Sequence, residues 1–213
     1  MELFREVILY IQDNPERFRE AVFVHIRLSA TALFLGIAIF IPLGVISSRT
    51  TRVGPALVGA VSSLRVLPSL AIIFLLYPLL GTGFQPALIA LTILAGPALV
   101  INTDAALRNV SPAVREAAVG LGMNIAQAFA RVELPLALPV IVAGVRTAAV
   151  EVIASATLAA FIGAGGLGAF ITSGLTLLDT RLLLVGAIPV AALALTVELF
   201  LSGVERLVSP PRA

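Results

Sequence analysis

Residues 28–48 read LSATALFLGIAIFIPLGVISS and contain no charged side chain. A helix rises about 1.5 Å per residue, so this stretch is long enough to cross a hydrocarbon core about 30 Å thick. Further apolar stretches follow at residues 55–80, 86–103, 136–162 and 182–204. We therefore predict an all-α membrane protein with about five transmembrane helices.

The composition supports this class. Of the 213 residues, 59% are hydrophobic and only 12% are charged, and the mean hydropathy is +1.08. A soluble domain is about 25% charged, so an ordinary soluble enzyme, a nucleic-acid binder and a disordered protein are excluded. The absence of cysteine and the single histidine, His25, exclude disulfides, thiol catalysis and a His/Cys metal site. We expect no catalytic and no metal-ligating residues.

The N-terminal residues 1–26 differ from the spans that follow. They carry mixed charge and lack the short apolar core and cleavage site of a secretory signal. The stretch 13–15 (Asp-Asn-Pro) predicts that a helix restarts at Pro15. One helical face collects apolar side chains, which predicts a helix lying in the membrane interface; these are Leu3, Phe4, Val7, Ile8 and Ile11.

The distribution of arginines predicts the orientation, because loops rich in basic residues stay in the cytoplasm. One set of loops would contain most of the arginines outside the N-terminal tail, and the opposite loops only Arg181. The first set is Arg49, Arg52, Arg108, Arg115, Arg131, Arg206 and Arg212. We therefore predict a cytoplasmic C-terminus, with the N-terminal arginines as the exception to the rule.

Residues 104–135 form the one long polar loop between spans. Ser111 before Pro112 predicts a helix start, and Asn124 with Gln127 predicts a second, through a capping box. The first helix ends in the glycines 120 and 122, and the second should stop before Pro135. One face of the first helix should carry Val114, Ala117, Ala118 and Leu121. The loop should thus be two short helices meeting at a corner at Gly122, either a solvated hairpin or a docking site for a partner groove.

The same loop resembles the EAA motif of ABC-importer permeases. Glu116, Ala117, Ala118 and Gly122 match this motif, followed at the family spacing by 132–135 (Val-Glu-Leu-Pro), which includes Leu134 and Pro135. Valine stands where the family usually has isoleucine. Outside the loop, residues 67–71, 133–139 and 157–168 resemble the osmoprotectant permeases, which import glycine betaine, choline or carnitine. The similarity extends over roughly residues 25–205.

The resemblance implies one transmembrane permease domain over residues 1–213, with the type I importer fold of methionine permeases and a cytoplasmic coupling loop at 104–135. It implies a multi-pass protein of a bacterial or archaeal cell membrane that works with three partners: cytoplasmic ABC ATPase subunits, an extracytoplasmic substrate-binding protein, and a second permease, either an identical or a related chain. ATP and Mg would be bound by the ATPase subunit, because this chain has no Gly-Lys-Ser/Thr phosphate loop. The chain should also contact membrane lipid, and we expect no nucleic-acid partner.

Charged groups within the predicted spans suggest pathway residues, because charge in a bilayer is costly and usually functional. Arg65, Arg146 and Glu151 are the candidates, together with Pro68 and Ser69 beside the kink. Arg146 and Glu151 point in different directions on one helix, so each needs a partner elsewhere. Two roles are open for these charged residues: ion pairs between helices, such as Arg65 with Glu151, or lining of the translocation pathway.

Two alternatives remain. Methionine or other amino-acid importers share the five-span plan and the Gly-rich stretch 163–168, so the sequence does not fix the solute. A secondary transporter working without ATP is less favoured, because such carriers usually contain a repeated pair of halves and acidic groups near the midplane; only Glu151 fits, and no repeat is visible.

Overall fold

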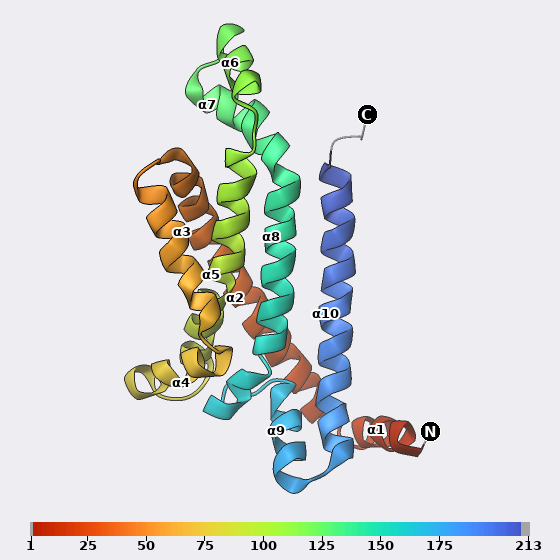
Figure 1. Cartoon of the computed structure of the whole chain (residues 1–213). Coiled ribbons are helices and arrows are strands. Elements are labelled where there is room, and N and C mark those ends of the chain that lie inside the picture. Colours follow the sequence, from red (N-terminus) through yellow and green to blue (C-terminus); the bar gives the residue numbers. More distant parts are fainter. Residues whose placement is uncertain (1, 210–213) are drawn as a thin grey trace. The chain divides into compact units, whose positions relative to one another are not determined.

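The computed structural model describes residues 2–209 as an assembly of helices, with no β-strand among those residues (Figure 1). The elements are α1 (Glu2–Asp13), α2 (Pro15–Arg49), α3 (Val53–Ser63), η1 (Leu64–Val66), α4 (Ser69–Leu80), α5 (Phe84–Arg108), α6 (Pro112–Gly120), α7 (Ile125–Ala128), η2 (Phe129–Glu133), α8 (Leu134–Ser155), η3 (Leu158–Ile162), α9 (Gly168–Leu177) and α10 (Thr180–Val208). The segments η1 and η3 are 3₁₀ turns, and η2 is π-helical.

The chain forms two compact units. Unit 1 comprises the residues up to Leu35, Leu67–Ala95 and Ala149–Val197, and unit 2 comprises Gly36–Val66, Gly96–Ala148 and the residues from Glu198 onward. The long helices α2, α5, α8 and α10 each contribute residues to both units. The expectation of a single permease domain over residues 1–213 stays a prediction.

Four of the predicted spans are confirmed as continuous helices, and the predicted span at 55–80 is a pair of helices bent by 96°. Within residues 2–209, α2, α5, α10 and the continuous helix Ile125–Ser155, which contains α8, are long and apolar enough to cross a bilayer. A fifth span exists if α3 and α4 are taken together across the break between them. The break falls at Pro68, whose backbone is extended (φ −57°, ψ 134°) and which has no N–H for a helical hydrogen bond.

The fourth span ends earlier than predicted. Its α-helix stops at Ser155, and a 3₁₀ turn replaces it before Ile162. The Thr157 hydroxyl donates to the Ala154 carbonyl oxygen at 2.7 Å, a local bond that competes with the helical ladder. In the Gly-rich stretch that follows, Gly166 has φ +74°, and a Cβ on it would lie 3.3 Å from His25 Cα, so glycine lets this loop approach α2 closely.

The core of unit 1 surrounds Phe170 of α9, which is buried. The Tyr10 ring packs edge to face against it, with 6.0 Å between the ring centres, and Val7 of α1 belongs to the same cluster. Phe4 of α1 remains 63% exposed. The amphipathic N-terminal helix and its restart at Pro15 are confirmed, whereas its place in the membrane interface stays a prediction.

Asp179 holds the turn between α9 and α10. Its Oδ1 accepts the backbone N–H groups of Arg181 at 2.9 Å and Leu182 at 3.3 Å, which satisfies donors at the start of α10 that have no partner within the helix. Its Oδ2 lies 3.1 Å from the Arg181 guanidinium. Desolvation raises the pKa of Asp179, but the hydrogen bonds from Leu182 and Arg181 outweigh it and lower the pKa overall.

Unit 2 is built on the packing of α5 against α8. A Cβ on Gly144 of α8 would lie 2.6 Å from Asn102 Cβ of α5, so only glycine allows this approach. The buried side chains of this core come from both helices and from Val110 just after α5; they are Ala106, Leu107, Val110, Ala137 and Ile141. Among the small residues of α8, Gly144 and Ala148 are buried, whereas Ala154 is exposed.

The described arginines of the predicted cytoplasmic set all belong to unit 2, and Arg181 belongs to unit 1. Arg212 of that set lies outside the described residues. The orientation in the membrane stays a prediction.

Candidate functional site

The loop between α5 and α8 is the predicted pair of short helices. Helix α6 begins at Pro112 after Ser111, and α7 begins after Asn124; Figure 1 shows the two meeting at a sharp corner. The Ser111 side chain forms no capping hydrogen bond. The capping box is complete, because Gln127 N–H donates to Asn124 Oδ1 at 2.9 Å and Asn124 N–H donates to Gln127 Oε1 at 3.0 Å.

Gly122 forms the corner as predicted. Its φ is +86°, a left-handed conformation that costs a residue with a side chain about 1–2 kcal/mol. Its N–H donates to Val119 O at 2.9 Å, and Met123 N–H donates to Ala118 O at 3.2 Å. This pair of bonds is the Schellman motif, which uses the last carbonyl groups of a helix. A Cβ on Gly122 would meet nothing within 4 Å, so backbone conformation alone requires glycine.

The second short helix does not stop before Pro135, contrary to the prediction. Helix α7 runs through η2 into α8 as one continuous helix. In η2, Leu134 N–H donates to Phe129 O, which is the wider π-helical register. The changed register accommodates Pro135 near the start of α8, where a missing N–H is tolerated. Leu134 packs on the core of unit 2, and Pro135 is exposed.

The loop presents an apolar surface to its surroundings. Val119, Leu121 and Ile125 are 53%, 81% and 83% exposed. Glu116 and Ala117 are exposed as well. Ala118, which we expected on the same outward face as Ala117, is only 3% exposed. This expectation was wrong, because adjacent residues of a helix are about 100° apart and cannot share one narrow face.

Glu133, which the sequence did not single out as a site residue, is the centre of the loop's ion pairs. Its side chain is 3% exposed, and its Oε2 lies 2.8 Å from Arg49 Nη2 and 2.9 Å from Arg115 Nη2. Arg49 is the last residue of α2, and Arg115 lies in α6. The carboxylate therefore ties three helical segments together. Its place next to Leu134 within the recognised motif was the one signal available.

A second unpredicted cluster fixes the end of α2. Arg108 donates to Asp104 Oδ2 at 2.9 Å, to Ser47 O at 2.7 Å and to Thr50 O at 3.3 Å. Ser47 Oγ donates to Asp104 Oδ1 at 2.7 Å. The guanidinium thus occupies carbonyl groups that a helix C-terminus leaves without partners, and its charge suits that end of the dipole.

Arg146, a predicted pathway residue, is in an ion-pair cluster of unit 2. Its Nη1 lies 3.5 Å from Glu198 Oε1 and 3.3 Å from Glu205 Oε2, both on α10. All three side chains are partly exposed, between 28% and 41%. Arg146 of α8 therefore pairs with two carboxylates of α10 within unit 2.

The structure places the other pathway candidates on separate elements. Arg65 is exposed in η1, and Pro68 and Ser69 begin α4. Glu151 is partly buried in α8. Their role in a pathway stays a prediction.

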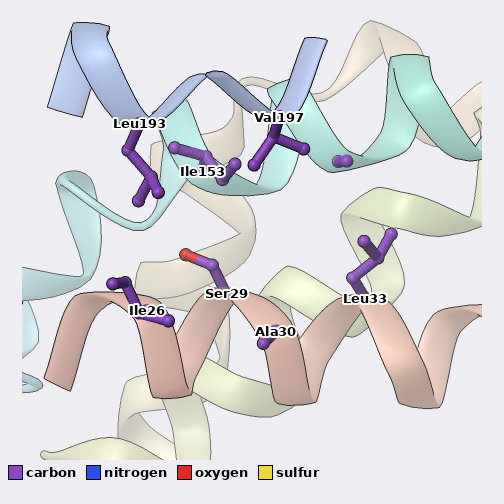
Figure 2. A pocket seen from close by; sticks show the side chains of 8 residues that line it. Ile26, Ser29, Ala30, Leu33, Ile153, Leu193 and Val197 are labelled. Carbon is purple, nitrogen blue, oxygen red and sulfur yellow. The ribbon is translucent and has the colours of Figure 1, made fainter. Parts of the chain in front are cut away.

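Unit 1 contains a small apolar cavity of about 130 Å³. Figure 2 shows Ser29 on α2 facing Ile153 of α8 and Leu193 and Val197 of α10 across it. His25, one turn before Ser29, is 1% exposed, and its Nε2 lies 3.2 Å from Ile153 O. It is a packed residue that joins α2 to α8 within the unit.

No group of three or more His, Cys, Asp or Glu side chains within residues 2–209 could hold a metal ion. The arrangement offers ion pairs between helices and an exposed apolar loop rather than a cluster of reactive groups.

Three relatives are similar to the chain over nearly its whole length. It is 42% identical to the carnitine transport permease protein OpuCB of Listeria monocytogenes over 96% of this chain and 94% of the relative. It is 38% identical to the choline transport system permease protein OpuBB of Bacillus subtilis, with the same coverage. It is 37% identical to the osmoprotectant import permease protein OsmW of Salmonella typhimurium over 96% of this chain and 98% of the relative.

Solved structures share the fold. An inward-facing structure of the MetNI methionine ABC transporter matches with a TM-score of 0.81 at 20% identity, over 91% of this chain and 96% of that chain. An amino acid ABC transporter crystallised with histidines matches with a TM-score of 0.71 at 19% identity, over 93% and 95%. The predicted type I importer fold is confirmed.

Residues 22–210 match the family model described as the binding-protein-dependent transport system inner membrane component. The match covers both units and the α6–α7 loop. The chain is a membrane protein and a transport subunit: it belongs to the permease family of binding-protein-dependent ABC importers.

Proposed function

We propose that this chain is the permease subunit of an ATP-driven importer for a small osmoprotectant such as glycine betaine, choline or carnitine. The observation that carries the proposal is the full-length similarity, at 37% to 42% identity, to permeases named for carnitine, choline and osmoprotectants. The methionine transporter, at 20% identity, shares the fold, and that likeness gives no reason to prefer methionine.

The α6–α7 loop is the proposed docking site of the ATPase subunit. Its exposed apolar residues Val119, Leu121 and Ile125 suit a groove on a partner protein, the helix-in-groove mode of recognition. Glu116, exposed beside them, can meet an arginine or a backbone N–H of that partner. The ATPase would bind ATP and Mg, and a second permease, identical or related, would complete the pathway.

Selectivity for the solute would reside in a separate substrate-binding protein. A tight site for a quaternary ammonium usually surrounds the cation with several aromatic rings. This chain has no tryptophan and two tyrosines. The pathway itself is proposed to pass Arg65, Pro68, Ser69 and Glu151, with Arg146 holding α8 to α10 beside it, a role supported by its two ion pairs in unit 2.

The test is reconstitution of the chain with its ATPase and binding-protein partners. We expect ATP hydrolysis to be stimulated when the binding protein is loaded with glycine betaine, choline or carnitine, and not with methionine. Omitting the binding protein is the control and should leave basal hydrolysis. Stimulation by methionine alone would assign the chain to the amino-acid importers.

A further inference from the structure

Glu133 is a buried carboxylate shared by two arginines from different helices. Both guanidinium groups approach the same oxygen, Oε2, at 2.8 Å from Arg49 and 2.9 Å from Arg115. A buried carboxylate without such partners is strongly disfavoured. The positions of α2, α6 and η2 within unit 2 therefore depend on one side chain.

The two arginines are held differently. Arg49 also lies over the Phe129 ring, with its guanidinium carbon 5.0 Å from the ring centre, which adds a cation–π contact. Arg115 has its Nε buried without a hydrogen-bond partner among residues 2–209. A buried donor without an acceptor is costly. The contact of Glu133 with Arg49 is thus the firmer one, and the contact with Arg115 on α6 is the one that separates more easily.

The position of Glu133 in the chain connects the loop to two long helices. It is the last residue of η2, which continues directly into α8, and Arg49 is the last residue of α2. Helix α6 is covalently separated from α8 by the corner at Gly122 and the short α7. The ion pair bypasses this corner, so a displacement of α6 reaches the ends of both long helices directly.

We infer that Glu133 is a positioning residue of the transport cycle, which transmits movement of α6 to α2 and α8 through Arg115 and Arg49. This rests on the proposed function, because it takes α6 as the helix on which the ATPase docks. Without the charge on Glu133, the ATPase would still bind the exposed surface of the loop, but its movement would no longer be passed fully to the spans.

The experiment uses the complete importer in liposomes and measures solute taken up per ATP hydrolysed, together with co-purification of the ATPase. Glu133→Gln keeps the shape and removes the charge, Glu133→Asp keeps the charge, and Arg115→Gln removes only the contact with α6. Arg131→Gln is the matched control, because Arg131 is exposed in the same η2 segment and has no ion pair among the described residues.

We expect Glu133→Gln and Arg115→Gln to retain the ATPase and to lose about tenfold in solute per ATP, the size of a typical coupling between sites. Glu133→Asp should recover part of the ratio, and Arg131→Gln should match the unaltered importer. A general folding defect would lower yield and activity without changing the ratio.

Unchanged solute per ATP in Glu133→Gln and Arg115→Gln would overturn the inference. Loss of ATPase co-purification with an unchanged ratio would overturn it as well, because Glu133 would then only shape the docking surface. If Glu133→Gln does not yield a folded importer, Arg115→Gln decides by the same criteria. Failure of the unaltered chain to bind an ATPase would instead refute the proposed function, and this inference with it.

Discussion

Arg108, the last residue of α5, should stabilise the end of α2 strongly, and its replacement by methionine tests this. Methionine preserves the aliphatic length and the helix propensity and removes the guanidinium. The variant loses the bond to Asp104 at 2.9 Å, the bond to Ser47 O of α2 at 2.7 Å and the bond to Thr50 O, just after α2, at 3.3 Å. It also leaves the Asp104 carboxylate, only 12% exposed, without its counter-ion.

The magnitude follows from these contacts. Hydrogen bonds to charged groups contribute about 1.5–3 kcal/mol each, but the Arg108 side chain is 36% exposed and water screens part of that energy. We expect a loss of about 3 kcal/mol in the free energy of unfolding. For a chain of this size 1 kcal/mol corresponds to about 2–4 °C, so Tm should fall by about 6–12 °C.

The assay is thermal unfolding of the purified protein in detergent. Arg52→Met is the matched control, because Arg52 is exposed and makes no side-chain cap for α3; its Tm should stay within about 2 °C. Asp104→Asn should lower Tm less when it is introduced into the Arg108→Met variant than when it is introduced into the unaltered chain, since the two groups are in contact. Equal Tm values for Arg108→Met and Arg52→Met would refute the reasoning.

Three further predictions concern the loop and the α9–α10 turn. Gly122→Val should strain the corner by about 1–2 kcal/mol and abolish co-purification of the ATPase; Gly120→Ala, where a Cβ meets nothing within 4 Å, is the control and should bind normally. Ala118→Trp should lower Tm because its site is buried, whereas Ala117→Trp should keep Tm and block the ATPase; the reverse pattern would contradict the assigned faces. Asp179→Asn should lower Tm at neutral pH, because the pKa of Asp179 is lowered in the folded chain. The stability that the carboxylate contributes is therefore present above its ordinary pKa of 3.8 and is lost as the pH falls through the lower folded value. The Tm values of the unaltered protein and the variant should converge in acid, and a difference that persists there would contradict the assignment.

Features set by neighbouring residues could be predicted from the sequence. Hydropathy located the spans, and glycine at residue 122 located the corner, because each depends on local composition or on a single backbone angle. The predicted helix end before Pro135 was wrong for a physical reason. A π-helical register accommodates the proline, and no residue type in the sequence predicts that register.

The ion pairs could not be predicted because they join residues far apart in the chain. Ser47 and Asp104 are separated by 57 residues, and the contact of Arg49 with Glu133 requires the end of α2 to meet the start of α8. The helical pattern placed Ala118 beside Ala117 on the outside of α6, whereas packing within the loop buries Ala118. A sequence pattern with a period of 3.6 resolves faces only for longer helices than α6.

The most direct measurement of the central claim is uptake of labelled glycine betaine, choline and carnitine into liposomes containing this chain and its ATPase, with the binding protein outside. We predict uptake of at least one of these solutes. This uptake should require ATP on the side of the membrane where the ATPase is bound and the binding protein on the other side. Uptake that proceeds without ATP, or that follows an ion gradient alone, would contradict the account.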